Sequence, residues 1–203
     1  MAQPHHAPPD LPSVQPVSLG HAATYADLEA LPEHLRGEIL RGQLYALPRP
    51  MTRHNRVLLS IAVQLINEFD EVIGGPGALK GWWILPEEEL HLGTDVLVPD
   101  VAGWQREQLP TLPAHPERIR VAPAWICEVL SPSTEAYDRG PKMEIYAGHG
   151  VREAWLVDPE ARTLEAFRSD GGRWRPAGTW RGHDAAAVGP FEALSLNLAQ
   201  IWT

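Results

Sequence analysis

The chain has 203 residues, 44% of them hydrophobic, and a formal net charge of −9. This length and apolar content support one ordinary hydrophobic core, so a single domain is expected. The negative charge argues against a protein that coats nucleic acid generally, because phosphate binding depends on Lys and Arg. The single cysteine, Cys127, excludes an internal disulfide and thiolate zinc sites, and its apolar surroundings in the sequence predict a core residue.

The first 23 residues differ from the rest of the chain. They are rich in Pro, His and Ala with little apolar periodicity, which predicts a flexible tail over 1–23 and a single domain over 24–203. They lack the basic start and apolar stretch of a signal peptide, and no window approaches about 20 uninterrupted apolar residues. We therefore expect a cytoplasmic protein with no membrane part.

The first predicted elements are a short helix, a hairpin and a long helix. Thr24 as an N-cap with Asp27 three residues later predicts a helix that Pro32 ends. Two apolar runs split by Arg-Gly in residues 37–47 (GEILRGQLYAL) favour a hairpin. Apolar residues at three- and four-residue steps predict a helix over 52–70.

Three strand-like runs follow, at 81–92, 95–104 and 122–130, and two of them are apolar in the centre, as buried strands should be. Residues 135–150 then predict a loop leading into a helix closed by glycines, and residues 152–169 predict two strands around a turn. The order is helix, three strands, helix, strand, with a hairpin at each end. This is an α/β fold.

A locally basic stretch runs against the overall negative charge. Residues 36–56 contain five arginines and one acidic residue, Glu38. Such a stretch suits an anionic ligand, and a solvated basic face is the alternative interpretation. The arginines are Arg36, Arg41, Arg49, Arg53 and Arg56.

Three polar residues lie at positions where a buried core would normally have apolar side chains. Asp100 follows an apolar strand and Pro99, Glu128 ends the run AWIC, and Lys142 begins the next predicted helix. Two carboxylates brought together by adjacent strands repel unless a cation holds both, and Mg²⁺ prefers one or two carboxylates with waters and phosphate oxygens. A nearby lysine would stabilise an attacking hydroxide or a phosphate.

Lysine usage bears on this prediction. Of 17 basic residues only Lys80 and Lys142 are lysines, so the chain uses arginine almost wherever charge is needed. A retained lysine hints at a specific need for an amine, and retention by chance is the alternative.

The segments VPDVAGW, EVLSPST and GVREAWLVDP, with Lys142 and Tyr146 downstream of the second, resemble the Uma family of restriction-endonuclease-like proteins. This family belongs to the PD-(D/E)XK nuclease superfamily, and the resemblance runs from about Tyr25 to Phe167. It implies a restriction-endonuclease-like core of three layers. It also implies that Asp100 and Glu128 bind a divalent metal, Mg²⁺ or Mn²⁺, with the backbone carbonyl of Val129.

One position departs from the superfamily pattern. The superfamily places its lysine two residues after the glutamate, and this chain has Leu130 there. The family resemblance implies that the amine comes from the following helix, where Lys142 matches. A lysine there can reach back over the sheet edge because its stem is long and flexible.

The segment RGEILRGQLYALPRPMTRH resembles the amino-terminal part of the family, which carries a Glu in a hairpin and a His opening the long helix. The matching residues are Glu38 and His54. Glu38 is then a third acid near the metal, and an exposed hairpin Glu paired with Arg36 or Arg41 is the alternative. His54 contacts a phosphate or the metal, or makes only a local hydrogen bond.

We therefore expect a Mg²⁺-dependent endonuclease that hydrolyses DNA phosphodiester bonds. Asp100, Glu128, Lys142 and Glu38 form the expected catalytic set, and a homodimer would let two sites cut two strands. The alternative function is a catalytically inactive nuclease-fold binding protein. A serine hydrolase using Ser131 or Ser133 is set aside because no G-x-S-x-G elbow is present. The expected DNA-binding residues are Arg49, Arg53, His54 and Arg56.

Overall fold

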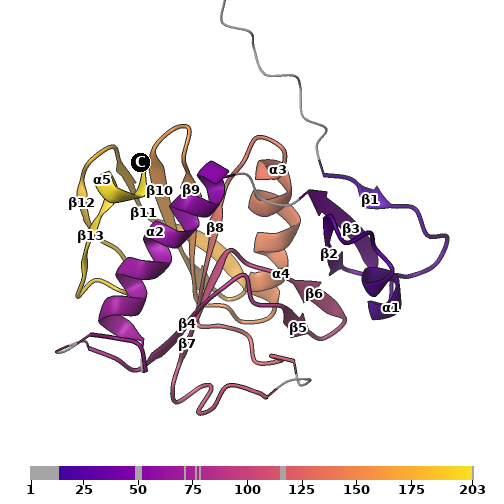
Figure 1. Cartoon of the computed structure of the whole chain (residues 1–203), viewed down its shortest axis with the longest axis horizontal. Helices are drawn as coiled ribbons and strands as arrows, with labels where there is room; N and C mark the ends of the chain where they lie inside the picture. Colours follow the sequence, from indigo (N-terminus) through magenta and orange to yellow (C-terminus); the bar gives the residue numbers. More distant parts are fainter. Residues whose placement is uncertain are drawn as a thin grey trace, which may run out of the picture.

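The computed structural model describes residues 14–48, 52–70, 72–75, 77, 79–114 and 118–202. At its centre lies a sheet with a helix on each face, and a second sheet with its own short helix lies to one side (Figure 1). The expected α/β fold is confirmed. Residues 1–13, most of the expected tail, lie outside the described residues, as does Arg49.

The central sheet has six strands, and its middle strands are apolar enough to be buried on both faces. All five residues of β8 are buried, which explains its nearly continuous apolar sequence. β8 and β9 run parallel, and the other described neighbours pair antiparallel. In spatial order the strands are β11 (Arg173–Arg181), β10 (Thr163–Asp170), β9 (Glu153–Asp158), β8 (Trp125–Val129), β7 (Val101–Gln105) and β4 (Trp82–Pro86).

Alternate residues of β8 point to different layers. Cys127 and Val129 pack in the same buried cluster as the apolar face of α2 (Thr52–Phe69). Ile126 packs in the other cluster, with Tyr146 from the helical segment 135–148. Because successive strand residues face opposite sides, Glu128 is directed toward that helical segment. The three layers seen in Figure 1 follow from this alternation.

The helical segment after β8 has an irregular middle. It consists of α3 (Glu135–Tyr137), a π-helical turn η1 (Asp138–Lys142) and α4 (Met143–Gly148). Pro141 lies inside the π turn and lacks an N–H to donate, which favours a wider turn at this point. Lys142 stands directly before α4, as expected, but helical conformation already begins at Glu135, where a loop was expected.

The second sheet holds the predicted amino-terminal hairpin. The hairpin pairs Glu38 with Tyr45, and α1 (Tyr25–Glu29) begins with the expected capping box of Thr24 and Asp27. A strand lies before the domain boundary expected at Thr24, since β1 pairs with β3. In spatial order the strands are β1 (Pro16–Val17), β3 (Gln43–Pro48), β2 (Leu35–Leu40), β6 (Asp95–Leu97) and β5 (Leu90–Leu92).

Two predicted strands are each divided between the two sheets. The run 81–92 forms β4 and β5, and the run 95–104 forms β6 and β7. Glu87, just after Pro86, has a φ of +50° and turns the chain away from the central sheet. Pro99 interrupts the second run because it has no N–H for a ladder. These breaks bring Asp100 to the start of β7.

The carboxyl-terminal part closes the face covered by α2. It contains β12 (Ala185–Ala187), β13 (Ser195–Asn197) and α5 (Leu198–Ile201). The Phe191 ring contacts the rings of Phe69, Trp82, Trp125 and Trp155 at centroid distances of 4.8 to 5.8 Å. Among the described residues, no helix has the length and apolar character needed to cross a membrane.

Candidate metal centre

Asp100 and Glu128 lie opposite each other on neighbouring strands. Val101 of β7 pairs with Cys127 of antiparallel β8. One residue back from Val101 and one residue on from Cys127, Asp100 therefore lies opposite Glu128. Both side chains are buried, at 2% and 1% exposure. The backbone N–H of Val129 donates to Asp100 Oδ2 at 2.6 Å, which joins the two strand ends directly.

Asp100 is held through one oxygen only. Its Oδ2 also lies 3.1 Å from His54 Nε2, while its Oδ1 is buried and has no hydrogen-bond partner among the described residues. Burial alone would raise the pKa of Asp100, but the His54 hydrogen bond and nearby positive charges lower it below its ordinary value. Asp100 therefore presents a carboxylate oxygen that no described residue contacts by a hydrogen bond.

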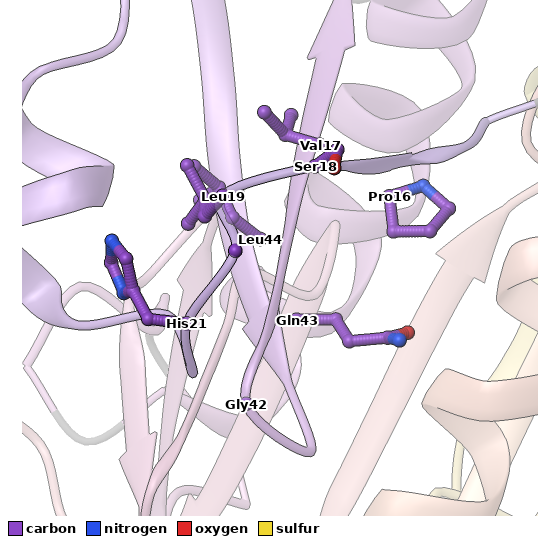
Figure 2. A pocket seen from close by; sticks show the side chains of 9 residues that line it. Pro16, Val17, Ser18, Leu19, His21, Gly42, Gln43 and Leu44 are labelled. Atoms are coloured by element: carbon purple, nitrogen blue, oxygen red, sulfur yellow. The ribbon is translucent and has the colours of Figure 1, made fainter.

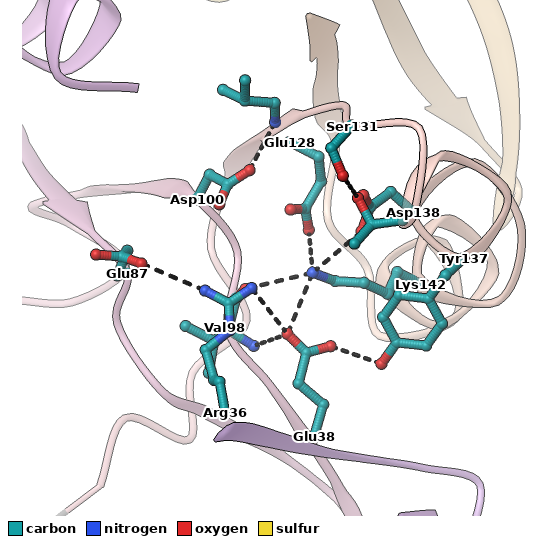
Figure 3. Close-up of polar contacts among 12 residues, drawn as sticks. Arg36, Glu38, Glu87, Val98, Asp100, Glu128, Ser131, Tyr137, Asp138 and Lys142 are labelled. Atoms are coloured by element: carbon teal, nitrogen blue, oxygen red, sulfur yellow. Dashed lines mark hydrogen bonds and ion pairs between the residues drawn. The ribbon is translucent and has the colours of Figure 1, made fainter. Parts of the chain in front are cut away.

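Glu128 is contacted by two donors at the same oxygen. The hydroxyl of Tyr146 donates to Oε1 at 2.7 Å. Lys142 Nζ lies 2.8 Å from the same oxygen (Figure 3). Burial raises the pKa of Glu128 to about 8, with Asp138, Asp100 and Glu38 adding to the rise against the opposing charge of Lys142. Neither donor occupies Oε2.

Lys142 reaches the site from the π turn and is 1% exposed. Besides Glu128, its ammonium lies 3.3 Å from Glu38 Oε1 and 3.6 Å from Asp138 Oδ1. It also donates to the carbonyl of Val98 at 3.3 Å. Burial alone would lower the pKa of Lys142, but the three carboxylates raise it above its ordinary value, which keeps the ammonium charged.

Glu38 is fully buried, which contradicts the alternative that it is an exposed hairpin residue. It accepts hydrogen bonds from the N–H of Val98 at 3.2 Å and from the hydroxyl of Tyr137 at 2.7 Å. Burial and the adjoining Glu38 carboxylate raise the pKa of Tyr137, so the phenol stays a donor. The amino-terminal hairpin thus contributes a third acid to the centre.

Asp138 is a fourth acid that sequence reasoning missed. It is buried in the π turn, and burial raises its pKa to about 6 against the opposing charge of Lys142. Its signal in the sequence is the four-residue spacing to Lys142, which brings the two onto one helix face. Residues 135–150 carry loop as well as helix signals, so the sequence alone does not show that this spacing falls on a helix.

Four carboxylates form what we call the acidic cluster: Glu38, Asp100, Glu128 and Asp138 (Figure 3). Lys142 is one cation beside it, and Arg36 is another, with its Nη2 3.9 Å from Glu38 Oε1. Four ionised acids would outnumber these two cations, and the pKa of Glu128, which burial raises to about 8, reflects the cost of that charge in the buried centre. Buried excess charge is costly, and a divalent cation is the counterion that removes it.

The donors present fit a hard divalent cation. Mg²⁺ and Mn²⁺ favour oxygen ligands, and Mg²⁺ is commonly held by one or two carboxylates with several waters. Asp100 Oδ1 and Glu128 Oε2 are carboxylate oxygens that neither His54 nor Lys142 occupies. No group of three or more His, Cys, Asp or Glu side chains in the described part of the chain is gathered tightly enough to enclose a metal by itself.

Two of the expected DNA-binding residues, Arg53 and Arg56, make their contacts outside the acidic cluster. Arg53 pairs with Glu160 at 3.0 Å and donates to the carbonyl of Pro159 at 2.9 Å. Arg56 lines a shallow depression with Ser60 and Gln200. Of the expected group, His54 alone among the described residues contacts a member of the cluster.

A second shallow hollow lies beside β1 and the turn between β2 and β3, lined by residues 16–21 and 42–44 (Figure 2). Its lining includes Gln43 and His21 but no member of the acidic cluster. The side chains of the acidic cluster therefore do not line this hollow.

Comparisons with known proteins agree with this fold. A crystal structure titled as a putative nuclease of DUF820 from Anabaena variabilis superposes with a TM-score of 0.68, covering 89% of this chain and 97% of its own, at 20% identity. An uncharacterized protein of Synechocystis sp., slr1290, is 25% identical over 146 residues, which is 68% of each chain. The model of the Uma2 family, described as "Putative restriction endonuclease", matches residues 22–199, and the chain therefore belongs to the Uma2 family.

Proposed function

We propose that this protein is a metal-dependent nuclease that hydrolyses DNA phosphodiester bonds at the acidic cluster. Asp100 and Glu128 would hold Mg²⁺ or Mn²⁺, together with the backbone carbonyl of Val129. The observation that carries the proposal is Asp100 Oδ1, a buried carboxylate oxygen without a hydrogen-bond partner among the described residues, opposite Glu128 in a centre of four acids. The match to a nuclease family supports the reaction class.

A bound divalent ion supplies an activated water and neutralises charge on the phosphate. The protein's own residues prepare the site for this chemistry. His54 and the Val129 N–H hold Asp100 by Oδ2, which leaves Oδ1 directed away from both donors. Tyr146 holds Glu128 by Oε1. Lys142 supplies the positive charge that stabilises an attacking hydroxide or the negative charge developing on phosphorus oxygens.

DNA as the substrate rests on the family description and on the basic residues of the amino-terminal half. Arg49, Arg53, His54 and Arg56 remain the proposed backbone contacts, because arginine binds phosphate through several donors at once. A homodimer also stays a proposal, and sedimentation equilibrium tests it. Two linked sites would explain cutting of both strands.

Plasmid cleavage in Mg²⁺ or Mn²⁺ tests the proposed function. Wild type is expected to nick or linearise the plasmid, and Asp100→Ala and Glu128→Ala to lose this activity. Glu144→Ala is the matched control, because Glu144 is an exposed acid of α4 that pairs with Arg41 outside the cluster. Cleavage that survives both cluster substitutions contradicts the proposal.

A catalytically inactive nuclease-fold binding protein is the second candidate. Two observations favour it: the net charge of −9, and the closed surroundings of Lys142, whose ammonium is buried among acceptors. Calorimetric titration with Mg²⁺ separates the two functions. A metal-dependent nuclease binds Mg²⁺ in a manner that Asp100→Asn abolishes, whereas a metal-free scaffold shows no such binding.

A further inference from the structure

Arg36 is the cation of the centre that incoming substrate can reach. Its side chain is 22% exposed, whereas that of Lys142 is 1% exposed. Arg36 projects from β2 two residues before Glu38, and the alternation of a strand brings both side chains to the same face. Figure 3 shows its guanidinium between Glu38 and Glu87.

The hydrogen-bonding capacity of Arg36 is largely unused. Its Nη1 lies 3.4 Å from Glu87 Oε1, its Nη2 lies 3.9 Å from Glu38 Oε1, and its buried Nε has no hydrogen-bond partner in the part of the chain that the structure describes. Arginine offers five donors in a planar fork that matches the oxygens of carboxylate or phosphate. Because both ion-pair contacts are long and Nε makes no hydrogen bond to a described residue, the guanidinium can bind an acceptor that comes closer.

Glu87 is placed beside the centre by its backbone. Its N–H donates to the carbonyl of Asp100 at 3.0 Å, and its φ of +50° is a left-handed conformation that costs a residue with a Cβ roughly 1 kcal/mol or more. Such strain concentrates at functional sites. The side chain of Glu87 remains 46% exposed, so water or a ligand can replace its contact with Arg36.

We propose that Arg36 binds a substrate phosphate beside Asp100, and that Glu87 occupies the place of that phosphate in the free protein. Binding exchanges a long, exposed Arg36–Glu87 ion pair for a charge-assisted contact with phosphate oxygens. Glu87 thereby weakens binding of any polyanion, since that polyanion must first release Arg36. This inference rests on the proposed function, because it requires a phosphodiester substrate at the acidic cluster.

Fluorescence anisotropy of a labelled DNA duplex tests the exchange, with Ca²⁺ standing in for Mg²⁺ as an ion that takes the same oxygen ligands. Glu87→Gln is expected to tighten binding by about fivefold, the upper range for release of an exposed ion pair. Glu88→Gln is the matched control, because it removes an equal charge from the same loop. It should change binding by less than about twofold through general charge alone.

Arg36→Gln and the double variant complete a thermodynamic cycle. Arg36→Gln should weaken binding, and Glu87→Gln added to it should then act no more strongly than Glu88→Gln. Arg36→Lys keeps the charge beside Glu38 if Arg36→Gln does not fold, and should recover part of the affinity. Equal effects of Glu87→Gln and Glu88→Gln in both backgrounds would overturn the inference while leaving a nuclease intact. A duplex that binds neither wild type nor Glu87→Gln would overturn the inference and the DNA function together.

Discussion

The ammonium of Lys142 lies 2.8 Å from Oε1 of Glu128, with both side chains almost entirely buried. In this conformation Lys142 acts as the counterion of Glu128. A lysine so enclosed touches no solvent-borne substrate, so its proposed role in catalysis requires that the contact with Glu128 loosen. A cation held by Asp100 and Glu128 would provide that change, because its charge would repel the ammonium, which Glu38 and Asp138 could still pair.

Lys142→Met is predicted to destabilise the metal-free protein. The substitution leaves the surrounding carboxylates without their buried counterion, and loss of one partner from a buried ion pair costs about 3–5 kcal/mol. Denaturant unfolding measures the loss in free energy of unfolding. Added Mn²⁺ should restore stability to the variant more than it stabilises wild type, because the ion then meets greater uncompensated charge.

Lys80→Met is the control for that experiment. Lys80 is exposed and is the other lysine in the chain, so its substitution should change stability by less than about 0.5 kcal/mol. A response to Mn²⁺ that is equal in wild type and Lys142→Met would contradict the view that lysine and metal share the same acids.

Tyr146→Phe is predicted to weaken divalent metal binding by about tenfold, which is usual for loss of a group that orients a ligand. The substitution removes the hydroxyl that holds Glu128 Oε1. Tyr137→Phe is matched to it, since that hydroxyl holds Glu38 in the same way. Calorimetry with Mn²⁺ should give a lower affinity for the first variant only. Equal Mn²⁺ affinities of Tyr146→Phe and Tyr137→Phe would show that Tyr146 has only a structural role.

His54→Ala is predicted to lower metal affinity through Asp100. Without the imidazole, Asp100 keeps the Val129 N–H as its remaining donor and gains rotational freedom. We expect about a tenfold loss of affinity for Mn²⁺. His149→Ala is the comparison, because His149 contacts Asp95 at 3.2 Å outside the acidic cluster. A loss of the same size in both variants would point to general destabilisation.

Phe191→Ala is predicted to reduce the free energy of unfolding by about 3–5 kcal/mol through the cavity it leaves. Phe191 is buried among the rings of Phe69, Trp125 and Trp155. Leu59→Ala serves as the exposed comparison, since Leu59 is 52% exposed on α2. Denaturant unfolding that gave the same midpoint for both variants would mean that the carboxyl-terminal segment does not stabilise the core.

Part of this architecture follows from local sequence. The stripe of apolar residues predicted α2 almost to the residue, and the Thr24–Asp27 spacing predicted the cap of α1. The burial of Asp100 and Glu128 at strand ends was predictable because each directly adjoins an apolar run. In these places the pattern and the structure depend on the same few neighbouring residues.

The rest depends on contacts between distant segments. Arg36 and Glu87 are 51 residues apart in the sequence. Their ion pair depends on the left-handed backbone at Glu87, which the sequence does not predict. Asp138 enters the cluster through a π turn at Pro141, for which a regular helical pattern makes no allowance. The division of two predicted strands between sheets likewise depends on which edge each half pairs with.

Anomalous scattering from a crystal soaked in Mn²⁺ tests the metal centre most directly. The proposed function predicts a peak between Asp100 Oδ1 and Glu128, with Lys142 facing it and drawn away from Glu128 Oε1. A peak at another group of acids, or an empty centre in crystals of protein that cleaves DNA in Mn²⁺, would contradict it.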